Sequence, residues 1–520
     1  MTDHNETGQP VARDADASGR MSRRALLAAS AGLAAGGCAS VSGKISSQTA
    51  TASAVAVEKE ELTPDALTWM PAWRLRGHIV RGHITALEAT NHFLSRIECL
   101  EPRLHMFRAV DHEGARAQAA AADKALAAGE PPGLLHGVPV STKEHISIEG
   151  LPSLHLGPSA TGLQGEASFP VAQHDSIVAE RLRTAGAILI GVNIMPGMGR
   201  GSGMPDLSGH PRNPWDPARA PGSSSAGGAA AVACGAVPIA IGSDGGGSTR
   251  LPSALCGVFG VHPTAGAVPN LDIDDPSVRM TVTFGPITRD VRDAAMIMKA
   301  IAGPDGRDIV STVRGEAPDY LSQLDKGAAG LELVWTDDFG FAGDYAVDQS
   351  PQVVAAVRNA ADGVTQLGAR LTETGETWES FWPHVTVTDT LFGRNPNAPV
   401  PSQDAMRTAL QVRQRNVEHF RKMFETCDIM LSPVIQFTAR TVEEWDASWR
   451  DILGFTPTYT SETFMFNWLG MPAVSIPCGF VDGLPIGLQA VGPVNSEPKL
   501  FRFAQAFMAR FPQNARPQLA

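Results

Sequence analysis

Two kinds of apolar segment alternate along most of the chain: stretches with helical periodicity and short, continuous apolar runs. Residues 62–128 follow a helical pattern, which ends in an alanine-rich stretch before Gly129. Residues 177–185 predict a helix that ends at Gly186, and the apolar run 187–191 then predicts a strand buried on both faces. A strand that follows a helix in this way indicates layers of helices packed on a sheet.

The chain after Gly129 repeats this alternation, with a less regular stretch over residues 303–460. Helices are predicted over 226–234, 352–367 and 406–425, and strands over 137–143, 237–242, 473–477 and 486–491. The fold class expected from the pattern is therefore α/β. Residues 303–460 are less regular and rich in Trp and Phe, and we interpret them as a cover that faces the substrate.

Composition limits the classes of function. The chain has 520 residues, of which 43% are hydrophobic and 18% charged, as in a globular protein with a sizeable core. That length fits one large α/β unit or about three domains. The formal net charge of −12 argues against a basic surface for nucleic acid or anionic membrane. We find no recognisable metal-ligand motif among the 14 His, and no metal or cofactor is expected.

The N-terminal segment is typical of an export signal. Arg23 and Arg24 precede an apolar stretch, residues 25–35, that is too short to span a bilayer stably. The paired arginines resemble the twin-arginine type of signal. We therefore interpret residues 1–37 as a disordered start and signal peptide, and expect an exported protein of the periplasm or cell envelope.

The residues after this segment divide into a tether and a body. Residues 38–61 are rich in Ser, Thr and Ala, and we interpret them as a tether, followed by a catalytic body over 62–510. Cys38 follows a degenerate lipoprotein box, so a lipid on Cys38 and an ordinary cleaved signal are both open. Contact with a membrane is expected only through such a lipid.

Candidate chemistry lies in a region rich in Gly and Ser, residues 221–256. Two polar clusters, 223–225 and 243–248, flank a helix of small residues and an apolar strand. Consecutive glycines let backbone N–H groups approach a ligand, and such groups before a serine can form an oxyanion hole. The apolar, regular flanks argue against a flexible linker, so a nucleophilic serine just after the second glycine run is favoured.

A nucleophilic serine needs a base, and no His lies beside either cluster. Lys143 is the other candidate, because it follows a largely apolar, extended segment. Burial there can lower the pKa of a lysine enough to make it a neutral base. The alternative is a surface lysine paired with a carboxylate such as Glu144.

Six blocks of sequence carry a resemblance that covers residues from about 62 to 507. They are GLLHGVPVSTKEHI (133–146), RNPWDPARAPGSSSAGG (212–228), GSDGGGSTRLPSALCGVFGVHPT (242–264), GPITR (285–289), FNWLGMPAVSIPCGF (466–480) and GLPIGLQAVGP (483–493). In order and spacing these blocks are similar to the amidase signature family. The resemblance implies a three-layer α/β/α fold with a mixed central β-sheet, and hydrolysis of small-molecule amides through an acyl-enzyme without a cofactor.

The resemblance also implies a role for individual residues. Ser248 falls at the position of the nucleophile, and Lys143 falls at the position of the base. Ser224 falls at the serine that follows a cis peptide bond and that relays the proton. The remaining implied positions are the oxyanion hole, formed by the backbone of Gly245, Gly246, Gly247 and Ser248, and structural support from Ser225, Asp244 and Arg250.

Several positions depart from the family pattern. Ser223 and Ala226 stand where glycines are usual, and Gly245 stands where a larger residue is usual. None of these changes removes a member of the triad, so the expected activity is hydrolysis of a carbon–nitrogen bond in a linear amide. Three alternatives remain: a Ser-His-Asp hydrolase with Ser224 as nucleophile, one subunit of an aminoacyl-tRNA amidotransferase, and an inactive binding protein on the same fold.

Overall fold

The computed structural model describes most of the chain after residue 61. The described residues are 62–154, 169–196, 209–272, 279–384, 387, 400–450 and 458–519. Contacts divide the chain into Met1–Glu58 and Lys59–Ala520, and the fold below is that of the second unit. The predicted signal peptide, the tether and Cys38 lie outside the described residues. No helix in the described part is long and apolar enough to cross a membrane.

One mixed sheet organises the described residues. Its eleven strands run in the order β1-β3-β2-β4-β6-β5-β10-β11-β9-β7-β8. Two sets of neighbours are parallel, β3-β2-β4 and β9-β7-β8, and all other neighbours are antiparallel. The bounds are β1 Phe107–Val110, β2 Pro139–Lys143, β3 Ile188–Asn193, β4 Ile239–Asp244, β5 Phe259–His262, β6 Thr283–Thr288, β7 Glu332–Trp335, β8 Arg370–Glu373, β9 Ile429–Pro433, β10 Ala473–Val481 and β11 Leu484–Val491.

Helices connect these strands. The α-helices are α1 Pro64–Trp69, α2 Ala72–Val80, α3 Ala86–Leu104, α4 His112–Ala127, α5 Ile177–Thr184, α6 Ala226–Ala233, α7 Arg250–Cys256, α9 Val291–Ile301, α10 Ile309–Arg314, α11 Ser350–Asp362, α13 Gln403–Met423, α14 Val442–Arg450, α16 Phe464–Leu469 and α17 Glu497–Arg510. Short 3₁₀ helices are η2 Leu324–Lys326, η3 Ala342–Tyr345, η4 Gly363–Leu367 and η5 Trp382–His384. Local sequence sets several ends: Thr85 and Glu88 form a capping box on α3, and Gly257 ends α7 in the left-handed conformation.

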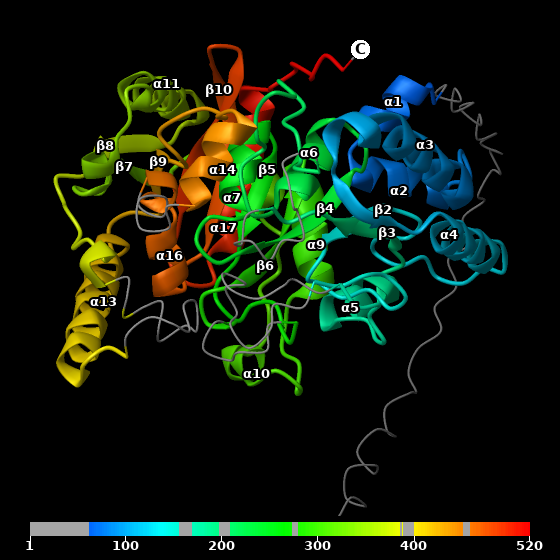
Figure 1. Cartoon of the computed structure of the whole chain (residues 1–520), viewed down its shortest axis with the longest axis horizontal. Helices are drawn as coiled ribbons and strands as arrows, with labels where there is room; N and C mark the ends of the chain where they lie inside the picture. The colour runs from blue at the N-terminus through cyan, green and yellow to red at the C-terminus, as the bar shows by residue number, and fades with distance from the viewer. Residues whose placement is uncertain are drawn as a thin grey trace, which may run out of the picture. The chain divides into compact units, whose positions relative to one another are not determined.

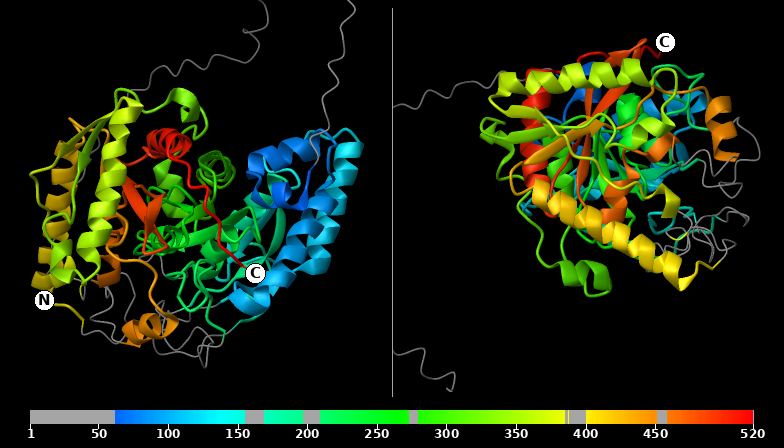
Figure 2. Two further views of the ribbon diagram at one scale, coloured as in Figure 1. Left: turned by 90° about the horizontal axis from the view of Figure 1, so that it is seen from above. Right: turned by 90° about the vertical axis from the view of Figure 1, so that its left-hand side faces the viewer.

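Helices cover both faces of the sheet, which gives three layers. Successive side chains of β3 point to opposite faces of the sheet. Ile188 and Ile190 pack with α3, α4 and α6 on one face, whereas Leu189 packs with α5 and α9 on the other. Helices α3 and α4 lie at one end of this arrangement, and α11 with β8 lies at the other (Figures 1 and 2). The α/β/α architecture and the mixed sheet are therefore confirmed.

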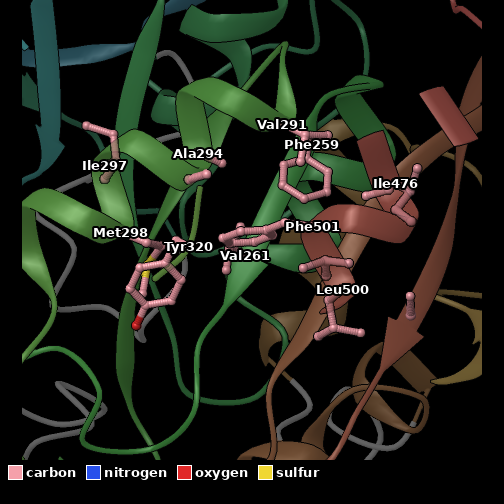
Figure 3. Close-up of a cluster of buried hydrophobic side chains, with 14 of the residues drawn as sticks. Phe259, Val261, Val291, Ala294, Ile297, Met298, Tyr320, Ile476, Leu500 and Phe501 are labelled. Atoms are coloured by element: carbon pink, nitrogen blue, oxygen red, sulfur yellow. The ribbon is translucent and has the colours of Figure 1, made fainter. Parts of the chain in front are cut away.

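The larger apolar core lies between the sheet and helices α9, α11 and α17. Figure 3 shows its centre, where Phe501 of α17 lies among Phe259 and Val261 of β5 and Ala294 of α9. The Phe259 and Phe501 rings meet edge to face, with centroids 6.1 Å apart. This packing fixes the middle of the sheet, which carries the polar residues described below.

Two expectations about elements need correction. Residues 62–128 are not all helical, because Phe107–Val110 form β1 and pair with β3 at the edge of the sheet. Residues 303–460 are more than a cover, because they contribute β7, β8 and β9 to the central sheet. These strands have only four or five residues each, too short for their apolar pattern to stand out.

Candidate active site

Lys143 lies at the end of β2, between β3 and β4 in the parallel part of the sheet. Its side chain is buried, and Nζ points to hydroxyl groups rather than to a carboxylate. It donates to Ser224 Oγ at 2.7 Å, to Ser243 Oγ at 2.9 Å and to the Ser243 carbonyl at 3.3 Å. The structure thus places the predicted base against the predicted relay serine.

Burial lowers the pKa of Lys143 to about 7, although the negative charges of Asp244 and Glu144 oppose the shift. Glu144 is engaged elsewhere: it accepts from Arg108 Nε at 2.7 Å and from the Met195 N–H at 2.7 Å. The alternative of a surface lysine paired with Glu144 is therefore wrong. A lysine with this pKa is substantially neutral near pH 7 and can accept a proton.

The serine turn before α6 holds two loops together. The peptide bond between Ser223 and Ser224 is cis, at the position that the resemblance implied. The Ser225 N–H donates to the Ser248 carbonyl at 3.0 Å. The Ser225 hydroxyl donates to the Ser243 carbonyl at 3.2 Å, and this hydroxyl accepts from the Ser243 N–H at 3.3 Å. Ser225 therefore joins this turn to the loop that carries Ser248, and its supporting role in the reaction stays a prediction.

Ser248 is half-buried in the turn between β4 and α7, in a loop that we call the catalytic loop (residues 245–249). Its hydroxyl makes no hydrogen bond to any described residue, so it is available to a substrate. The N–H groups of Gly246 and Ser248 likewise have no partner among these residues. Two unpaired N–H groups beside a free serine hydroxyl suit an oxyanion hole.

The prediction that Gly247 contributes its N–H to the oxyanion hole needs correction. This N–H donates to Asp244 Oδ1 at 2.6 Å, so it is already occupied. Gly247 has a different role, because its φ of +121° is one that side-chain-bearing residues rarely adopt. The N–H groups of Gly246 and Ser248, two of the four predicted oxyanion residues, have no partner among the described residues.

Asp244 and Arg250 form a buried ion pair that brackets the catalytic loop. Arg250 Nε donates to Asp244 Oδ2 at 2.9 Å, and Nη2 donates to Oδ1 at 3.0 Å. Both side chains are fully buried. The Arg250 guanidinium holds the pKa of Asp244 well below its usual range, against the effect of burial. These contacts tie both ends of the catalytic loop together, and the importance of the pair for the reaction stays a prediction.

Sequence reasoning missed three residues that come from distant segments. Asn467 of α16 donates to the Asp244 carbonyl at 2.8 Å and accepts from Arg250 Nη2 at 2.6 Å. Gln489 of β11 accepts from Arg250 Nη1 at 2.8 Å. Thr463 donates to the Gly246 carbonyl at 2.7 Å. Each lies more than 200 positions from the loop, and only the sheet order brings it there.

Other polar and aromatic residues have structural roles. Trp378, Phe381 and Trp382 are buried together in an aromatic cluster with Phe464 and Phe466, which favours core packing over substrate contact.

In the described part of the chain, no group of three His, Cys, Asp or Glu could hold a metal ion.

Comparison with known proteins agrees with this geometry. The model of the family described as Amidase matches residues 88–389 and 375–501. The chain is 30% identical to an acylamidase of Rhodococcus erythropolis, over 86% of this chain and 97% of that protein. It is also 32% identical to a glutamyl-tRNA(Gln) amidotransferase subunit from Salinispora arenicola, over 85% of this chain and 97% of that protein.

Solved structures show the same fold at lower identity. A bacterial aryl acylamidase of the amidase signature family superposes with a TM-score of 0.71 at 24% identity, covering 86% of this chain and 97% of its own. A peptide amidase from Stenotrophomonas maltophilia gives a TM-score of 0.68 at 22% identity, covering 86% and 98%. The family match over most of the chain and the similarity to two curated relatives agree: this chain belongs to the amidase signature family, whose enzymes hydrolyse amides.

Proposed function

We propose that the protein is an amidase that hydrolyses a linear amide to a carboxylate and an amine or ammonia, with Ser248 as nucleophile, Ser224 as proton relay and Lys143 as base. The observation that carries the proposal is the 2.7 Å contact between Lys143 Nζ and Ser224 Oγ in a buried setting. A lysine that is partly neutral near pH 7 has a serine at hydrogen-bond distance through which to act.

The proposed reaction has two halves. Its first step needs the Ser248 hydroxyl to meet Ser224 Oγ when the substrate is bound, because no hydrogen bond joins these two groups in the described structure. Neutral Lys143 accepts the proton of Ser224 while Ser224 accepts that of Ser248, and Ser248 Oγ forms a bond to the amide carbon. The carbonyl oxygen becomes negative and is stabilised by the Gly246 and Ser248 N–H groups. The carbon–nitrogen bond then breaks, and the amine takes its proton from Ser224, which recovers one from Lys143. Water hydrolyses the resulting ester by the same relay.

An assay on purified protein tests this proposal. A panel of anilides, aliphatic amides and peptide amides, followed by mass spectrometry, should show release of a carboxylate and an amine for at least one class. Ser248→Ala should reduce turnover by at least about 10³-fold. Ser311→Ala is the matched control, because Ser311 is a buried serine of α10 whose hydroxyl donates to the Asp308 carbonyl. An unchanged rate in Ser248→Ala would contradict the proposal.

The amidotransferase subunits among the relatives favour a second candidate, a protein that releases ammonia from glutamine for a partner enzyme. The twin-arginine-like segment around Arg23 and Arg24 argues against it, because that activity needs a cytosolic complex. Glutamine hydrolysis by the isolated chain, raised at least tenfold by an amidotransferase partner and exceeding its rate on every other amide, would favour this second function.

Export is part of the proposal and has its own test. We propose that residues 1–37 direct the protein to the periplasm or cell envelope by the twin-arginine route. Replacing Arg23 and Arg24 together by Lys should trap precursor in the cytoplasm, and normal export of the double variant would contradict this route. Labelled palmitate should appear on Cys38 only if that cysteine is lipidated, and Cys38→Ala should then remove the label.

A further inference from the structure

The two unpaired N–H groups of the catalytic loop are separated by a single peptide unit. This unit consists of the Gly246 carbonyl and the Gly247 N–H. Its two α-carbons, those of Gly246 and Gly247, join it to the peptide groups that carry the Gly246 and Ser248 N–H bonds, so its place in the loop helps to set where both bonds point. Glycines restrict the backbone little by themselves, so contacts from outside the loop must hold this unit in place.

Both polar groups of this peptide unit have such a contact. The Gly247 N–H donates to Asp244 Oδ1 at 2.6 Å, and the Gly246 carbonyl accepts from Thr463 Oγ1 at 2.7 Å. Asp244 belongs to β4, next to the loop. Thr463 lies more than 200 positions away, directly before α16, and is fully buried.

Thr463 is itself held firmly. Its carbonyl accepts from Arg250 Nη1 at 3.1 Å, and its N–H donates to the Thr460 carbonyl at 3.1 Å. The loop is packed closely against it, because a Cβ added to Gly247 would lie 2.3 Å from Thr463 Oγ1. The hydroxyl also lies 3.4 Å from the Thr460 carbonyl, but the Gly246 carbonyl, at 2.7 Å, is the nearer acceptor.

We propose that Thr463 is a positioning residue for the reaction: its hydroxyl fixes the Gly246 carbonyl and thereby aims the Gly246 and Ser248 N–H groups at the oxyanion. This inference rests on the proposed function. An oxyanion is present in the transition state and not in the bound substrate, so the bond contributes to kcat rather than to KM. Thr463 acts through the loop and does not touch the substrate.

Three variants test this role. Thr463→Val keeps the shape of the side chain but removes the hydroxyl, and should lower kcat by about 10- to 100-fold with KM within about threefold of wild type. Thr463→Ser keeps the hydroxyl and should stay within about fivefold in kcat. Thr68→Val is the matched control, because buried Thr68 of α1 donates to the Pro64 carbonyl at 2.8 Å, and its kcat should be normal.

A second measurement distinguishes a change in the direction of the Gly246 and Ser248 N–H groups from a general loss of rigidity in the site. A trifluoromethyl ketone forms a tetrahedral oxyanion with a serine, so its inhibition constant should rise in Thr463→Val in parallel with the loss of kcat. If Thr463→Val does not fold, the same comparison of inhibition constant and KM is made with Thr463→Ala.

Particular results would overturn the inference. Normal kcat and inhibitor affinity in folded Thr463→Val would do so, as would an equal loss in Thr463→Ser, because the hydroxyl would then not be the group that matters. Failure of the proposed function is distinguishable, since Ser248→Ala would then keep its activity whatever Thr463 does.

Discussion

The replacement Lys143→Met gives the sharpest prediction, because it removes the amine and keeps the apolar stem of the side chain. Lys143 is 1% exposed, and its Nζ contacts only Ser224 and Ser243 within hydrogen-bond distance among the described residues. Burial lowers its pKa from 10.5 to about 7. By linkage, that difference corresponds to about 5 kcal/mol disfavouring the charged form in the folded protein.

The sign of the effect on stability follows from proton binding. Between pH 7 and 10.5 the unfolded chain holds a proton on Lys143 that the folded protein has largely lost, so wild-type stability rises with pH in this window. Below pH 7 the full destabilising contribution is present. Lys143→Met lacks this dependence, and wild type should therefore gain about 2 kcal/mol relative to the variant between pH 7 and pH 9.

Urea unfolding of both proteins at pH 7, 8 and 9 measures this difference directly. Contributions from all other titrating groups cancel to the extent that the two structures agree. The activity of the wild type should depend on the same group, so kcat/KM should rise with pH through about 7. Lys143→Met should be inactive because it has no amine. Lys143→Arg should also be inactive, because Arg does not deprotonate in this range. A difference in unfolding free energy that stays constant from pH 7 to pH 9 would refute the reasoning.

Three further predictions concern the residues around Lys143 and the catalytic loop. Ser224→Ala should lower kcat by about 10³-fold while slow labelling of Ser248 by a phosphonate persists, since the nucleophile survives without its relay; a near-normal kcat would exclude the relay. Arg250→Met should cost about 3–5 kcal/mol in urea unfolding, because it leaves Asp244 buried without its ion pair, and a loss below about 1 kcal/mol would contradict that account. Gly247→Ala should lower the unfolding free energy by at least about 2 kcal/mol and should also lower kcat, because the added Cβ would lie 2.3 Å from Thr463 Oγ1. Unchanged values of both quantities would show that the loop can move aside.

Local sequence was sufficient for the parts of the site that lie close together in the chain. The glycines and serines of residues 221–256 predicted a loop with a nucleophile, and the isolated Lys143 predicted a buried base. The burial of Lys143 and its contact with Ser224 agree with the second expectation, and the nucleophile in the loop stays a prediction. The glycine run was informative because its flanks are apolar and regular, and Lys143 was informative because a lysine is rare in a buried strand.

Sequence could not supply what depends on the order of the strands. Thr463 and Asn467 reach the catalytic loop because β10, which follows α16, lies beside β5 and β11 in the sheet. Nothing local distinguishes Thr463 from other polar residues before a helix, and Asn467 falls in the block 466–480 without a residue pattern that assigns it a role. The occupied N–H of Gly247 was missed for a similar reason, since the hydrogen bond to Asp244 is a matter of backbone geometry rather than of residue type.

The central claim is that Ser248, and not Ser224, carries the acyl group. Purified protein is treated with a fluorophosphonate and digested with trypsin, which releases residues 220–250 as one peptide that contains both serines. Fragment ions then locate the added mass. The account predicts that the C-terminal fragment beginning at Ser248 carries it and that the fragment beginning at Thr249 does not. Label confined to Ser224 would contradict the account, and the triad assignment would be withdrawn.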